Sequence, residues 1–261
     1  MSEVLLREFQ IDWKLSGKAH QTVGDYSRYV RAYLSSGCEV SLVGAKAWLE
    51  STESISTRRK YAQALRAFGK WCCENEYAGF EWWSRLPLAP EQQRIQRTVG
   101  VSDVTLARQL AKTKRDKALV EVLWSTGLRR SEIARAKIED IDFAGGFVIV
   151  PQTKNGQPRV APLSSEACKA IRRHLSGRTS GSLFEMTGNA IMLRLRSLGI
   201  ANAHAWRRGW AVESLRRGVS EASVKVAAGW SSGAMVSRYT AALSSELAVE
   251  EFSRSWESGR N

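Results

Sequence analysis

The sequence predicts a mainly α-helical protein with one small β-hairpin sheet, divided into two domains. Three observations support this fold class. Apolar residues recur at helical spacing through the first 87 residues, where no convincing strand occurs. A single pair of β-rich segments flanks an Asn-Gly turn. A proline-containing stretch without periodicity interrupts the chain near residue 90.

The first domain, expected over 1–87, contains four predicted helices. They cover 4–15, 22–34, 42–49 and a longer stretch that begins near residue 55. In the first helix the apolar stripe consists of Leu5, Leu6, Phe9 and Trp13. The other faces of the fourth helix hold four basic residues, Arg58, Arg59, Lys60 and Arg66. Because cations at a helix start oppose the helix dipole, a role in contacting phosphate groups is as good an interpretation of these residues as an ordinary solvated face.

A linker is expected over 88–101, because this segment contains proline and loses helical periodicity. The second domain is then 102–261. Counted on either side of Ile95, the formal charge is about +2 before this residue and about +11 after it. The second domain therefore carries nearly all of the positive charge of the chain.

The second domain begins with helices from about 102 to 125, which contribute Leu119, Val122 and Leu123 to the core. Two short strands follow over 147–151 and 159–163, around a turn over 154–157 that places Lys154 at the tip of a hairpin. Helices are expected again over 165–175, 189–198, 204–217 and 220–228, and in the segment leading into Tyr239.

Composition limits the classes of function. The 261 residues are 43% hydrophobic and 25% charged, which is typical of a globular protein. The net charge of +13 favours a polyanionic partner, most often nucleic acid. No apolar run reaches the roughly 18 residues of a spanning helix, and the N-terminus is too acidic for a secretory signal, so we expect the cytoplasm of a bacterial host cell.

No metal and no cofactor are expected. The cysteines Cys38, Cys72, Cys73 and Cys168 show no metal-ligand spacing, and the three histidines are scattered. The sequence contains neither an ATP-binding Walker loop nor a dinucleotide fingerprint. The chemistry is therefore expected to use amino-acid side chains alone.

A set of short motifs in the second domain carries a family resemblance. Thr126-Gly127-Leu128-Arg129 is followed by Ser131-Glu132, and Lys154 comes about 25 residues after the arginine. His204 and Arg207 are one helical turn apart, and Gly229-Trp230 precedes Tyr239. Together these residues resemble the tyrosine recombinases, the phage integrase family of DNA strand-exchange enzymes. The resemblance covers most of the chain and is strongest over 125–239.

The resemblance implies a two-domain fold that clamps DNA, and a chemistry without metal or ATP. Arg129 and Arg207 would hold the nonbridging oxygens of a DNA phosphate, with Glu132 holding a buried Arg129. Lys154 would protonate the departing 5′ oxygen, and His204 would assist proton transfer or orient the phosphate. Tyr239 would attack the phosphorus and form a 3′-phosphotyrosyl ester.

Several of these residues also have ordinary structural interpretations. Arg130 adjoins Arg129 on a helix start and is expected to be solvated, while Arg208 is as good a candidate as Arg207 from sequence alone. A lysine at a hairpin tip needs no function. Most members of the family have histidine at the position of Trp230. An indole N–H donates a hydrogen bond but does not readily transfer a proton, so Trp230 is expected to pack and hydrogen-bond at the phosphate.

The implied function is site-specific recombination of double-stranded DNA in a phage or mobile element. The family acts as a homotetramer on synapsed sites, with or without a directionality factor. The helical pattern starts close to Met1, so a compact form without an arm-binding domain is expected. The tail residues Leu247, Val249, Phe252 and Trp256 suit a helix that covers the core or docks on a neighbouring subunit. Two other interpretations stay open: a type IB topoisomerase-like enzyme or hairpin-forming resolvase, and a non-catalytic DNA-binding protein.

Overall fold

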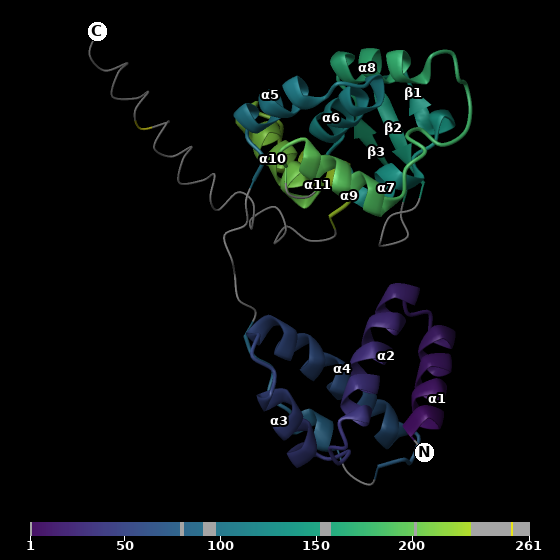
Figure 1. The fold of residues 1–261 in the computed structure, drawn as a ribbon, viewed down its shortest axis with the longest axis vertical. Coiled ribbons are helices and arrows are strands. Elements are labelled where there is room, and N and C mark those ends of the chain that lie inside the picture. Colours follow the sequence, from purple (N-terminus) through teal and green to yellow (C-terminus); the bar gives the residue numbers. More distant parts are fainter. Residues whose placement is uncertain are drawn as a thin grey trace. The chain divides into compact units, whose positions relative to one another are not determined.

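The computed structural model describes residues 2–78, 81–90, 98–151, 158–200, 203–230 and 252 (Figure 1). The chain divides into two compact units, Met1–Ile95 and Gln96–Asn261. Helices dominate the described residues of both units, and a small antiparallel sheet lies in the second unit. The mainly α fold with a small sheet, predicted from the sequence, is confirmed. The predicted linker 88–101 includes 91–97, which lie outside the described residues.

The four helices predicted in the first unit are present. They are α1 (Ser2–Leu15), α2 (His20–Ser35), α3 (Leu42–Glu50) and α4 (Ile55–Glu74). The side-chain oxygens of Ser41 and Ser54 cap α3 and α4, accepting hydrogen bonds from backbone N–H groups in the first turn. A short 3-10 helix, η1 (Trp82–Arg85), was not among the predicted elements, because four residues are too few to show a period.

Helix α4 forms the centre of the first unit. Helices α2 and α3 and the short η1 all pack on it, and α1 packs on α2. The predicted core residues Leu65, Phe68 and Trp71 are at most 5% exposed. Gly69 lies where a Cβ atom would come within 2.7 Å of the Trp82 ring, so the glycine lets η1 approach the helix closely.

The second unit contains eleven described elements, of which the first six run from α5 to β2. They are α5 (Val101–Leu110), α6 (Lys114–Thr126), α7 (Arg130–Arg135), η2 (Ile138–Asp140) and the strands β1 (Ile141–Asp142) and β2 (Phe147–Val150). The elements that follow are β3 (Arg159–Pro162), α8 (Ser165–Leu175), α9 (Gly188–Ser197), α10 (Ala203–Arg216) and α11 (Glu221–Ala228). Helix α6 packs against both α8 and α10, and its predicted core residues Leu119, Val122 and Leu123 are fully buried.

The sheet has the order β1-β2-β3 and is antiparallel throughout. Strands β2 and β3 are the predicted hairpin, with Val150 paired to Arg159, while the two-residue strand β1 was not predicted. The hairpin turn over 152–157, with Lys154, lies outside the described residues. Side chains alternate along the strands: Val148 and Arg159 are buried, whereas Ile149 and Val160 are about half exposed. Arg159 therefore occupies an inward position.

Candidate active site

The structure describes five of the seven residues predicted for the site or its support. Arg129 and Glu132 lie at the start of α7, His204 and Arg207 lie on α10, and Trp230 follows α11. Lys154 and Tyr239 lie outside the described residues. The described part of the predicted site is therefore the part that contains its two arginines.

A left-handed glycine makes the corner that presents Arg129. Gly127 ends α6 with φ +57°, and a Cβ atom there would lie 2.4 Å from the indole of Trp210 on α10. Both the backbone conformation and the packing of α10 thus require glycine. The chain then turns into α7, where Arg129 is the N-cap residue. The turn at Thr126-Gly127 therefore sets the direction in which the chain enters α7, and with it the position of Arg129.

Glu132 holds Arg129, as the sequence predicts. Its carboxylate accepts a hydrogen bond from the backbone N–H of Arg129 at 2.7 Å and another from Nη1 of the Arg129 side chain at 2.8 Å. The Arg129 side chain is 22% exposed, so it is partly buried rather than fully buried as expected.

Glu132 has a second cationic partner that was not predicted. Arg159 of β3 donates from Nη1 to Oε1 and from Nη2 to Oε2, both at 2.9 Å. Burial by itself would raise the pKa of Glu132, but hydrogen bonds from Arg159 and Arg129 outweigh it and lower that pKa to about 2. Glu132 is therefore an ionised carboxylate between two guanidinium groups.

Arg207 is buried and anchored by backbone carbonyls. Its Nη1 donates to the carbonyl of Gly127 at 2.8 Å, and its Nη2 donates to the carbonyl of Ala228. The side chain thus joins the C-terminal ends of α6 and α11. Each terminal nitrogen of a guanidinium carries two N–H groups, so binding to these carbonyls is compatible with binding to phosphate oxygens.

His204 lies one turn before Arg207 and is exposed at the surface of the unit. Its pKa is lowered, first because neighbouring protein atoms remove part of the solvation of the ring and then because four arginines act on it. These are Arg208, Arg207, Arg129 and Arg130, in decreasing order of effect. Arginines from α10 and from the start of α7 therefore meet around one imidazole.

Trp230 is buried directly after the left-handed Gly229, which ends α11 with φ +63°. The guanidinium of Arg207 lies over its ring, 5.3 Å from the ring centre. This distance is within the range of a cation–π interaction. The structure thus brings together Arg129, His204, Arg207 and Trp230.

Two further arginines, Arg208 and Arg130, adjoin Arg207 and Arg129 in the sequence. Arg208 is 7% exposed and Arg207 is 4% exposed, so burial does not separate the two. What separates them is position, because Arg207 reaches both the Gly127 carbonyl and the Trp230 ring. Arg130 is exposed, as the sequence predicts, and contacts the sulfur of Met192 at 3.4 Å.

In the first unit, three of the four basic residues proposed for DNA contact bind backbone carbonyls. Arg58 donates twice to Thr52, at 3.0 and 2.6 Å, and Arg59 donates to Ala89. Arg66 donates to Ser84 at 3.1 Å, and Lys60 is exposed. Arg58, Arg59 and Arg66 thus have structural roles in the first unit whether or not they also reach phosphate.

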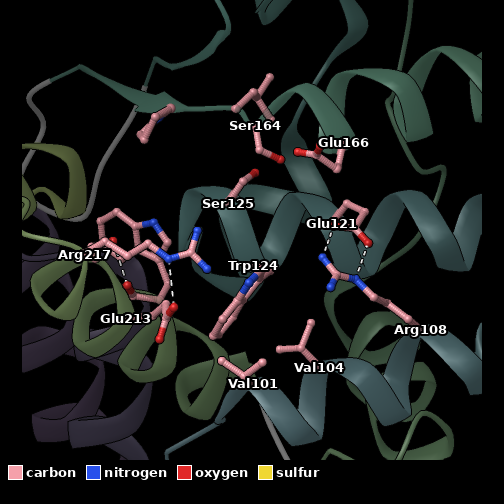
Figure 2. A pocket seen from close by; sticks show the side chains of 14 residues that line it. Val101, Val104, Arg108, Glu121, Trp124, Ser125, Ser164, Glu166, Glu213 and Arg217 are labelled. Carbon is pink, nitrogen blue, oxygen red and sulfur yellow. Dashed lines mark hydrogen bonds and ion pairs between the residues drawn. The ribbon is translucent and has the colours of Figure 1, made fainter.

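A separate cleft of about 530 Å³ lies in the second unit and shares no residue with the arginine cluster (Figure 2). Four of its five charged side chains form two ion pairs, Arg108 with Glu121 and Arg217 with Glu213, and the fifth is the carboxylate of Glu166. This internal pairing makes the cleft a poor phosphate site. Across the described residues, no group of three or more potential ligands could hold a metal ion. No described helix is long and apolar enough to cross a membrane.

Sequence reasoning missed Arg159. The available signal was its position, because the alternation of the predicted strand places it on the inward face. A buried arginine requires an ionic or hydrogen-bonding partner. The identity of that partner depends on how β3 packs against α7, which no local pattern reveals.

Comparison with known proteins gives a consistent picture. The model of the phage integrase family matches residues 104–246. Tyrosine recombinase XerA of Pyrococcus furiosus is 32% identical over 187 residues, which cover 69% of this chain and 63% of the relative, so the match spans less than two thirds of that protein. XerA of Thermococcus onnurineus is 24% identical over 280 aligned residues, covering 98% of this chain and 95% of the relative.

Two solved structures share the fold. An integrase of the Tn1549 transposon in complex with transposon right-end DNA has a TM-score of 0.71 at 17% identity, covering 94% of this chain and 99% of the other. A lambda integrase dimer bound to a core site has a TM-score of 0.73 at 14% identity, covering 91% and 94%. The chain is thus similar in sequence and in fold to proteins with one common architecture.

Proposed function

The chain belongs to the phage integrase family, and on that premise we propose that it is a site-specific tyrosine recombinase. It cleaves and rejoins double-stranded DNA through a 3′-phosphotyrosyl intermediate. The relatives named as tyrosine recombinases support this reaction, and the DNA complexes of the structural neighbours support DNA as the substrate.

The observation that carries the proposal is the meeting of Arg129 and Arg207 beside His204. The two arginines come from different helices, and each is held by groups of the protein: Arg129 by Glu132, and Arg207 by the carbonyls of Gly127 and Ala228. Partial desolvation of the ring is the largest cause of the lowered pKa of His204, and both arginines add to it, which supports a concentration of positive charge around this imidazole. A phosphodiester gains negative charge on its nonbridging oxygens in the transition state, and fixed guanidiniums stabilise that charge.

The other roles follow from this arrangement. The lowered pKa of His204, caused first by partial desolvation and then by the nearby arginines, favours the neutral imidazole, which can accept a proton or hydrogen-bond the phosphate. Trp230 supports Arg207 with its ring and has no group that titrates. Lys154 as the acid for the 5′ oxygen and Tyr239 as the nucleophile are proposed from their motif positions. Together these assignments provide the nucleophile of a transesterification and the acid that protonates its leaving group.

We also propose that the protein serves a phage or mobile element and works as a tetramer on two synapsed sites, with a directionality factor as a further partner. The place of action would be the cytoplasm. Two of the relatives come from archaea, so the proposal covers archaeal as well as bacterial hosts. In the first unit, the exposed Lys60 is the strongest of the four candidates for phosphate contact.

The reaction is tested by trapping the covalent intermediate. A pool of short duplexes with a randomised core carries a nick beside the expected cleavage position, so that the released fragment dissociates and the adduct persists. Wild-type protein should give an SDS-resistant adduct, and sequencing of the attached DNA should return one core sequence. Tyr239→Phe should give none, while Tyr77→Phe, in the first unit, should behave as wild type. Equal adducts from wild type and Tyr239→Phe would overturn the proposal.

A second assay separates recombination from topoisomerase activity. With the selected core sequence in two duplexes, a recombinase exchanges strands between them. A type IB topoisomerase-like enzyme instead relaxes supercoiled plasmid that lacks the sequence. Relaxation without exchange would replace the recombinase by the topoisomerase.

A further inference from the structure

We propose that Arg159 is a positioning residue that fixes Arg129 through Glu132 and ties the end of α11 to the same carboxylate. The inference rests on the proposed function, because it assigns to Arg129 the role of phosphate ligand. Arg159 does not belong to the motifs that carry the family resemblance.

All three nitrogens of the Arg159 guanidinium donate hydrogen bonds to residues of other elements. Nη1 and Nη2 donate to the two oxygens of Glu132 on α7, both at 2.9 Å, and Nε donates to the carbonyl of Ala227 on α11 at 2.8 Å. The side chain is 4% exposed and that of Glu132 is 2% exposed. This is a planar two-point pair with a third bond at its side, which lysine cannot reproduce.

The pair sets the orientation of the carboxylate that Arg129 uses. Glu132 Oε1 accepts from Arg159 Nη1 and Arg129 Nη1, and Oε2 accepts from Arg159 Nη2 and the Arg129 backbone N–H. Each oxygen is thus shared between the two arginines. Because the Arg159 fork fixes the carboxylate plane, the direction of the Arg129 guanidinium is fixed as well.

The third bond links Arg159 to the support of Arg207. Arg159 binds the carbonyl of Ala227, and Arg207 binds the next carbonyl, that of Ala228. The chain then turns at Gly229, where a Cβ atom would lie 2.8 Å from Cδ of Arg159. The last turn of α11 therefore lies between the two guanidiniums and delivers Trp230 to the ring contact with Arg207. One buried side chain supports both proposed phosphate-binding arginines.

A purely structural ion pair is the competing interpretation. Buried ion pairs often add little net stability, because desolvation offsets the attraction, although removing one partner destabilises the fold. A structural role predicts a loss of stability and nothing more. A positioning role also predicts that the surroundings of His204 change, since Arg129 is one of the cations that act on it.

The test is a histidine titration by NMR on the full-length chain without DNA. The chain has three histidines, His20, His174 and His204, and His204→Gln assigns the third signal. In Arg159→Lys the charge is kept, while the two-point pair with Glu132 and the third bond to Ala227 are lost. The pKa of His204 should rise, because Arg129 is no longer held beside it, while partial desolvation, Arg208 and Arg207 continue to keep it below its ordinary value. The pKa of His174, which burial lowers in the wild-type chain, should stay unchanged.

Arg194→Lys is the matched control. Arg194 makes an equivalent two-nitrogen pair with the buried Asp116, elsewhere in the same unit. This variant should lose stability in thermal unfolding without changing the titration of His204. If Arg159→Lys does not fold, Glu132→Asp breaks the same bridge from its other end and also conserves charge. In either folded variant, an unchanged or lower His204 pKa would overturn the positioning role.

The rate of DNA cleavage provides a second readout of the positioning role. With the trapped core sequence, Arg159→Lys should form the covalent adduct roughly tenfold more slowly at saturating DNA than wild type. Absence of an adduct from wild-type protein would refute the proposed function and leave the titration result standing. A wild-type rate in Arg159→Lys would refute the positioning role alone.

Discussion

The guanidinium of Arg207 lies 5.3 Å from the centre of the Trp230 ring and over its face. Arg207 comes from the first half of α10, whereas Trp230 follows the last residue of α11. The contact thus joins α10 to the residue that follows the end of α11. A cation over an indole face is worth roughly 0.5 to 2 kcal/mol, depending on its desolvation.

The first prediction concerns this ring. Trp230→Ala should lower the free energy of unfolding by about 3 to 5 kcal/mol, since it removes a buried aromatic side chain. It should also slow adduct formation, because Arg207 loses its support. Trp230→Phe retains a ring face and should lose much less of both. Chemical denaturation and the trapping assay measure the two effects; equal losses in the two variants would argue against the cation–π contact.

The second prediction concerns Gly127. Gly127→Ala combines a left-handed backbone with a Cβ atom 2.4 Å from the Trp210 ring. It should destabilise the chain by roughly 2 to 5 kcal/mol and displace the carbonyl that anchors Arg207. Gly177→Ala is the control, because Gly177 has φ +95° but no atom within 4 Å of the added Cβ. The control should cost only the backbone strain, about 1 to 2 kcal/mol. Similar values for both variants would show that the Trp210 contact does not matter.

The third prediction is the pH dependence that Glu132 contributes. Its pKa is lowered in the folded chain from 4.5 to about 2. The ionised carboxylate therefore stabilises the folded chain above about pH 4.5, and this stabilisation is lost as the pH falls toward 2. The loss should be about 3 kcal/mol across this window.

Urea unfolding at a series of acidic pH values measures this effect. Glu132→Gln should lower stability at neutral pH and flatten the acid dependence. Glu121→Gln, which removes a carboxylate paired with the exposed Arg108, should leave the wild-type slope nearly intact. A Glu132→Gln curve parallel to that of wild type would contradict the lowered pKa.

The fourth prediction separates the basic residues of α4. Lys60→Ala should weaken DNA binding and reduce the slope of log affinity against log salt by about 1, without changing stability. Arg58→Ala should lower stability, because the Thr52 carbonyl loses two donors. Fluorescence anisotropy over a range of salt concentrations and thermal unfolding provide the two readouts. A stable Lys60→Ala protein with the wild-type salt slope would exclude Lys60 from the phosphate surface.

Local patterns account for the elements that the sequence predicted. The helices and the hairpin repeat their apolar residues over several turns or pairs, so each element carries its own signal. The 3-10 helix η1 and the strand β1 have four and two residues, and neither is long enough to show a period. Their conformations depend instead on neighbours: η1 packs on α4, and β1 pairs with β2.

The sequence by itself determined the longer helices and the hairpin, and it identified Arg129, Glu132, His204, Arg207 and Trp230 as candidates, because periodicity and motif spacing are properties of the chain. Only the tertiary structure decided that Arg159 shares Glu132 with Arg129, and that Arg207 is anchored at Gly127 and Ala228. The physical reason is the distance along the sequence over which each interaction acts. A periodic apolar stripe lies within one element, whereas a buried charge finds its partner on whichever element packs against it.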